Sequence, residues 1–137
     1  MSDRQRPSGQ WEGAGADPRS PLLDYAYLDT CLQHGIPGAR LLQMVDLFEH
    51  RFAEDRLLIL EALEAGDLAR VRASAHRLKG SSGSIGLATL RSRAADLEAA
   101  AKGGDPAACR SALERFQEVG RASIRAFRDH LKAHAPE

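Results

Sequence analysis

The sequence is poor in β-branched residues, and this scarcity excludes most sheet folds. Val, Ile and Thr together number only nine of the 137 residues, whereas Ala and Leu are the two most frequent residue types. Because β-branched side chains favour strands and Ala and Leu favour helices, a β-sandwich or barrel is excluded. A chain of this length is one ordinary domain, and it can bury a core without disulfides or metals.

Net charge, long apolar runs and paired cysteines are also lacking. The 19 basic and 19 acidic residues give a formal net charge of +0, so no overall charge attracts nucleic acid or an anionic membrane. No apolar run approaches the roughly 18–20 residues that span a bilayer, and residues 1–20 contain no apolar signal segment. The only cysteines, Cys31 and Cys109, form no CxxC pair. We therefore expect a cytoplasmic protein with reduced thiols and no nucleic-acid or membrane partner.

Residues 1–20 differ in composition from the rest of the chain. They are rich in Gly, Pro, Ser and charged residues, and Trp11 is their only aromatic residue. Such a composition cannot offset the entropy lost on ordering. Residues 1–20 are therefore predicted to be a disordered N-terminal arm, and residues 21–135 a helical domain. Trp11 could instead anchor this arm on the folded part.

Two helices are expected in the first half of the folded domain. Ser20-Pro21 is expected to begin a short helix, as an N-cap followed by Pro at the first helical position. This helix ends near Gln33, before a break rich in Gly and Pro. Over residues 39–65, apolar residues recur at steps of three and four, which predicts a long helix with one buried face. Gly66 is expected to end it.

Three more helices, each with an apolar stripe, are expected in the rest of the domain, joined by short connections. Asp67 is expected to cap the third helix, Gly103-Gly104 to end the fourth, and Asp105-Pro106 to start the last. Short connections make neighbouring helices antiparallel. The predicted fold class is all-α: an antiparallel four-helix bundle with a short additional N-terminal helix. The absence of a long heptad seam favours a monomer.

A second face of the third helix does not look like an ordinary solvated surface. Relative to His76, Arg72 lies one turn earlier, Lys79 and Gly80 one turn later, and Gly83 two turns later. Each Gly in a helix interior costs about 1 kcal/mol relative to Ala. Two of them on the same stripe as an exposed His indicate that space is needed beside the imidazole. We expect this space to admit another backbone or a bulky group.

The charges around His76 favour a phosphoryl group or an acidic partner. From residue 70 to residue 93 the chain has no acidic residue but six basic ones, namely Arg70, Arg72, Arg77, Lys79, Arg91 and Arg93. A neutral imidazole is a competent nucleophile toward phosphorus. No Walker A loop, kinase-type Gly-rich loop or Asp cluster for Mg²⁺ is present. The chain is therefore expected to hold no metal or cofactor, and any Mg²⁺ is expected on a partner.

The segment from Ala75 to Gly86, AHRLKGSSGSIG, resembles the signature of histidine-containing phosphotransfer (HPt) domains. The family pattern is an AHxLKG core followed by small residues and an aliphatic-Gly pair. The resemblance covers residues 66–103 as motif and residues 22–132 as helix pattern. It implies a four-helix bundle whose exposed His passes phosphoryl groups between receiver-domain aspartates in a two-component multistep phosphorelay.

The resemblance also implies a role for each matching residue. His76 matches the phosphoacceptor, and Lys79 matches the Lys that neutralises the phosphoryl group. Gly80 matches the Gly that lets the receiver approach, and Gly83 falls where a small residue is favoured. Glu98 is the nearest match to the polar side chain of the following helix that approaches the imidazole. The implied partners are response-regulator receiver domains and a histidine kinase, including a hybrid kinase.

Other interpretations of the motif remain open. The leading one is a phosphocarrier without turnover of its own. The chain could instead be the phosphoacceptor domain for a separate chemotaxis-type histidine kinase, which has a similar His-x-x-Lys-Gly motif. It could also be an adaptor that binds a receiver without transfer. The dimerisation helix of a sensor kinase is disfavoured, because Arg77 rather than an acidic residue follows His76 and no Pro occurs nearby.

Overall fold

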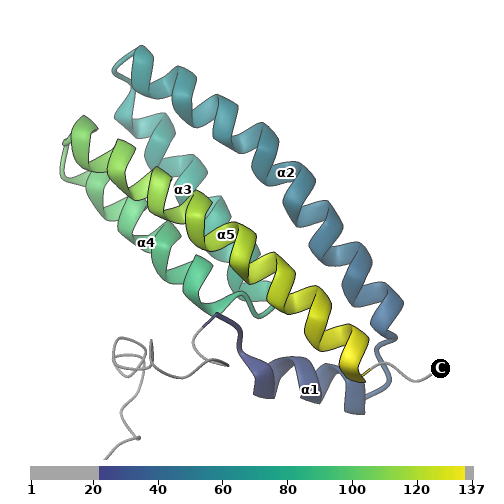
Figure 1. Ribbon diagram of the computed structural model, residues 1–137. Coiled ribbons are helices and arrows are strands. Elements are labelled where there is room, and N and C mark those ends of the chain that lie inside the picture. Colours follow the sequence, from purple (N-terminus) through teal and green to yellow (C-terminus); the bar gives the residue numbers. More distant parts are fainter. Residues whose placement is uncertain (1–21, 135–137) are drawn as a thin grey trace, which may run out of the picture.

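The computed structural model describes residues 22–134, which form five helices (Figure 1). These are α1 (Tyr25–Gln33), α2 (Gly38–Glu64), α3 (Leu68–Ser84), α4 (Ala88–Lys102) and α5 (Pro106–His134). No strand occurs between residues 22 and 134, so the predicted all-helical class is confirmed. The predicted arm, residues 1–20, lies outside the described residues.

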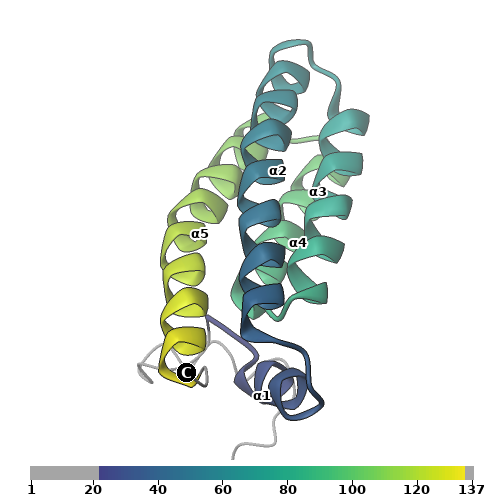
Figure 2. The ribbon, with the colours of Figure 1, turned by 90° about the vertical axis from the view of Figure 1, so that its right-hand side faces the viewer.

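The four long helices, α2 to α5, lie side by side, and α1 lies across one end of them (Figures 1 and 2). Helix α3 packs against α2 and α4, and α5 packs against α4 and α2. The core between them is built mainly from Leu and Ala, with Phe116 and Phe127 of α5 as its largest fully buried side chains. Within residues 22–134, no helix is both long and apolar enough to cross a membrane.

The helix boundaries follow from glycines and caps that the sequence contains. Each connection has one Gly with a positive φ, between +72° and +89°: Gly35, Gly66, Gly86 and Gly104. Gly has no Cβ, so it adopts this left-handed conformation without strain. The predicted starts of α3 and α5 are confirmed, because the carboxylates of Asp67 and Asp105 accept hydrogen bonds from backbone N–H groups in the first turns.

The first helix begins later than predicted. Residues 22–24 form a turn and bend, and α1 starts only at Tyr25, whereas the predicted start at Ser20-Pro21 lies outside the described residues. Asp24 caps α1 instead, since its carboxylate accepts a 3.0 Å hydrogen bond from the N–H of Tyr27. The backbone N–H of Asp24 donates to the carbonyl of Gly86 at 2.8 Å. This contact and the burial of Leu23 hold residues 23 and 24 beside the α3–α4 turn before the helix begins.

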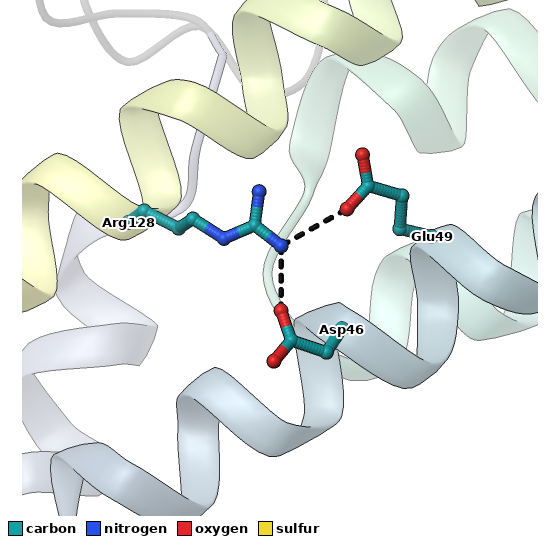
Figure 3. A network of polar contacts seen from close by, with 3 residues as sticks. All are labelled: Asp46, Glu49 and Arg128. Carbon is teal, nitrogen blue, oxygen red and sulfur yellow. Dashed lines mark hydrogen bonds and ion pairs between the residues drawn. The ribbon is translucent and has the colours of Figure 1, made fainter.

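Polar contacts connect α5 to α1 and α2. The guanidinium of Arg128 donates to the carboxylates of Asp46 and Glu49, which lie one turn apart on α2 (Figure 3). Near the end of α5, a ring nitrogen of the almost buried His130 lies 2.9 Å from Asp29 of α1. These contacts lie on the α2–α5 side and at the α1 end, so they leave the outward face of α3 uncovered.

Candidate phosphotransfer site

His76 lies in the middle of α3, on the side of the helix that faces away from the core. Its neighbours Ala75 and Leu78 are buried, with 0% and 1% of their surface exposed, whereas 68% of the His76 side chain is exposed. The helical period explains this contrast, because Ala75 and Leu78 belong to the buried apolar stripe and His76 lies on the opposite side of the helix. An exposed imidazole in a rigid helix is accessible to a partner without local unfolding.

Glu98 of α4 contacts both His76 and Lys79. Its Oε2 lies 3.0 Å from Nδ1 of His76, and its Oε1 lies 3.0 Å from Nζ of Lys79. The tight α3–α4 turn produces this contact, because it packs the two helices directly against each other. The hydrogen bond from Lys79, followed by that from His76, holds the pKa of Glu98 below its ordinary value. Glu98 is therefore ionised at neutral pH.

This contact fixes the protonation pattern of the His76 ring. An ionised carboxylate can only accept hydrogen bonds, so Nδ1 of His76 must be the donor, with its proton on that nitrogen. In a neutral ring the lone pair is then on Nε2. The site thus combines an available ring nitrogen with a primary ammonium group, that of Lys79, one turn along the same face.

The two glycines on the His76 face have different surroundings. Apart from the adjacent residues and backbone of α3 itself, no atom of the described residues lies within 4 Å of the position that a Cβ of Gly80 would take, so this surface is open as expected. At Gly83 the expectation of free space is wrong. A Cβ there would lie 2.9 Å from Cδ of Arg91 in α4, so the space that Gly83 vacates is filled by that side chain. Sequence reasoning grouped Arg91 only with the nearby basic residues, since nothing along the chain indicates which arginine crosses from α4.

The basic character of the segment is weaker in the folded protein than the sequence suggests. Three of its arginines lie within 4.0 Å of acidic side chains, in the pairs Arg70–Asp67, Arg77–Asp55 and Arg93–Asp96. Asp55 comes from α2, which the segment alone could not indicate. Arg72 is exposed one turn before His76, and within residues 22–134 neither Arg72 nor Arg91 has a carboxylate at this distance. The uncompensated positive charge therefore lies at two points of the His76 face.

Comparison with known protein families gives a match to the Hpt domain over residues 43–134. The chain belongs to the Hpt domain family. The match includes all of α3, α4 and α5 and most of α2, so it contains the site residues together with the helices that position them. HPt domains take part in histidine phosphotransfer within phosphorelays, together with receiver domains and kinases. No curated protein and no solved structure matched this chain.

The lowered pKa of Glu98 predicts how acid affects the site. A carboxyl group whose pKa is lower in the folded state stabilises the fold above its unfolded pKa, and this contribution is lost as pH falls through the folded value. Wild type should therefore be more stable than Glu98→Gln near neutral pH. The difference should shrink as pH falls below the ordinary Glu pKa of 4.5 and disappear below the lowered pKa of the folded state. Urea unfolding of both proteins from about pH 7 to about pH 3 measures this. A difference that does not change with pH would contradict the ionised bridge.

Proposed function

We propose that this HPt domain carries a phosphoryl group on Nε2 of His76 between receiver-domain aspartates in a multistep two-component phosphorelay. The observation that supports this most strongly is the contact between Glu98 and Nδ1 of the exposed His76 ring. Because Nδ1 is engaged, Nε2 is the nitrogen that can attack. Membership of the Hpt family supports the general activity, and the contacts of His76, Lys79 and Glu98 support the residue assignments.

During uptake, the lone pair on Nε2 of His76 attacks the phosphorus of an aspartyl phosphate on the donor receiver. The N–P bond forms as the P–O bond to the aspartate breaks, and the electron pair of that bond remains on the departing carboxylate. The ring keeps its Nδ1 proton and becomes positively charged, so the Glu98 carboxylate at 3.0 Å stabilises the product. Attack by an aspartate of a second receiver reverses these steps and removes the phosphoryl group from His76.

Lys79 would change partners during this step. In the unloaded protein its ammonium group is 3.0 Å from Glu98, and its side chain is 30% exposed, so it can reach groups outside the helix surface. A phosphoryl group on His76 brings up to two negative charges one turn away. We infer that Lys79 then binds the phosphoryl oxygens by charge-assisted hydrogen bonds, while Glu98 remains with the cationic ring.

The surface beside His76 has features that suit docking of a folded domain. Gly80 leaves it open next to the imidazole. On the α2 side an apolar groove of about 210 Å³ runs along α3, lined by residues that include Met44, Leu47 and Leu78. More than half of the surface of Leu47 is exposed, and large exposed apolar groups are typical of interaction surfaces. Because the chain belongs to the Hpt family, a receiver domain is the partner that we expect at this surface.

We infer that the protein is a carrier rather than an enzyme with its own turnover. Phosphoryl transfer needs mainly positioning and charge neutralisation, and His76, Lys79 and Glu98 can contribute these from one chain. Mg²⁺ is assigned to the receiver, and no cofactor to this chain. We further infer that α2 to α5 form the antiparallel four-helix bundle of the family, since tight turns join consecutive long helices. We also infer a monomer, because the sequence has no long heptad seam.

A phosphotransfer screen tests the proposed function. Purified protein is mixed with a panel of phosphorylated receiver domains from the same genome and Mg²⁺, and label on each chain is followed over time. We expect acid-labile labelling from one or two receivers, abolished in His76→Gln. The matched control is His50→Gln, which alters an exposed His of α2 that pairs with Glu54 and should leave transfer unchanged.

Other results of this screen would reject parts of the proposal. Labelling that persists in His76→Gln would show that His76 is not the acceptor. Labelling by a kinase with ATP but by no receiver would identify the chain as a chemotaxis-type phosphoacceptor. Direct uptake from phosphoramidate, a small donor that needs no docking, reports separately whether His76 itself is reactive.

Replacing Gly80 should separate stability from transfer. Gly80→Ala places a methyl group in open space within a helix, so we expect the free energy of unfolding to rise by about 1 kcal/mol. The same methyl group lies where a docked receiver would approach, so transfer from the receiver should slow by about tenfold, equivalent to ~1.4 kcal/mol. Uptake from phosphoramidate should not change. Unaltered receiver transfer in this variant would contradict docking over Gly80.

A further inference from the structure

Gly83 and Arg91 form a contact between α3 and α4 that the transfer chemistry leaves unexplained. A Cβ at Gly83 would lie 2.9 Å from Cδ and 3.1 Å from Nε of Arg91. Real Cβ atoms do not approach other heavy atoms so closely, so any larger residue at position 83 would displace the Arg91 side chain. Gly83 therefore provides a shallow seat in α3 for the stem of an arginine from α4. We call this pair the Gly83–Arg91 seat.

The seat lies on the same face of α3 as His76. Gly83 follows His76 by seven residues, which is nearly two helical turns and about 10.5 Å along the axis. The open surface of Gly80 lies between them. A partner that covers His76 and Gly80 would therefore reach Arg91 at the edge of the contact, away from the reacting nitrogen.

Arg91 carries a positive charge without an acidic partner in the part of the chain that the structure describes. Its side chain is exposed, and within residues 22–134 no carboxylate lies within 4.0 Å of it. Asp24 lines the same surface cavity as Gly80, Gly83 and Arg91, but its carboxylate caps α1 and forms no ion pair with Arg91 within 4.0 Å. By contrast, Arg77 and Arg93 nearby have carboxylate partners within the chain.

We propose that Arg91, seated over Gly83, is a partner-recognition residue that binds a carboxylate of the receiver domain docked on His76. This inference rests on the proposed function and adds a specific contact to it. A guanidinium binds carboxylates through two parallel hydrogen bonds. Packing of the Arg91 stem against Gly83 would limit its conformations before the partner arrives and so reduce the entropy lost on binding. A charge at the rim of an interface acts mainly on the association rate.

The position of Arg91 predicts which kinetic constant changes. Arg91 lies beside Gly83, about two turns from His76. Arg91→Glu should therefore raise the apparent KM for the phosphorylated receiver by about tenfold, the effect of ~1.4 kcal/mol. The maximal transfer rate should stay within about twofold, since the reacting groups are unchanged. The dependence of transfer on salt should also weaken. Uptake from phosphoramidate should equal that of wild type.

The matched control is Arg110→Glu, which makes the same change of charge at an exposed arginine near the start of α5. It should leave the KM for the receiver unchanged. The experiment uses the full chain and the receiver that labels wild type in the screen. An Arg91→Glu variant with the KM of the control would overturn the proposal. So would an equal loss of phosphoramidate uptake, because Arg91 would then act on His76 itself.

Gly83→Ala tests the seat. If the methyl group acts by displacing Arg91, Gly83→Ala and Arg91→Ala should each raise KM, and the double variant should be no worse than the more impaired single variant. Fully additive losses would show that Gly83 acts independently of Arg91, and would overturn the claim that Gly83 acts by accommodating the Arg91 side chain. Failure of wild type to accept label from any receiver would reject the proposed function and this inference together, whereas normal wild-type transfer with unaffected variants would reject only the inference.

Discussion

The chemistry proposed for this HPt domain depends on one carboxylate, that of Glu98. It lies on α4 and reaches His76 and Lys79 on α3, with both contacts at 3.0 Å. These contacts exist only if the two helices keep one register relative to each other. The tight turn at Gly86 and the burial of Leu90, Ala94 and Leu97 along the facing side of α4 provide that register. The packing of the core thus determines which ring nitrogen of His76 is free.

The face of α3 around His76 is a compromise between helix stability and access. Gly80 weakens the helix and gains no internal contact, which is reasonable only if another molecule uses the open surface. Gly83 also weakens the helix, but a side chain of the same protein fills its space. In the proposed function, Gly thus serves two purposes: at one position it exposes the site, and at the other it positions a cation at the edge of the site.

Much of the fold could be predicted from the sequence, because helix period, caps and turn glycines are local signals. Asp67 and Asp105 cap helices as predicted, and the apolar stripe of α3 is buried with His76 on the opposite side. The start of α1 could not be predicted, since it depends on tertiary contacts of Asp24 with the α3–α4 turn. For the same reason the sequence could not indicate that Arg91, of the arginines near the motif, is the one that occupies the space at Gly83.

The most direct test of the central claim is the position of the phosphoryl group on the ring. The full chain, labelled with nitrogen-15 at histidine, is phosphorylated by phosphoramidate and examined by phosphorus–nitrogen NMR. The account predicts one phosphorylated histidine, His76, with phosphorus bonded to Nε2 and a proton retained on Nδ1. Phosphorus on Nδ1 would contradict the role of Glu98, and phosphorylation of another histidine would contradict the assignment of the site.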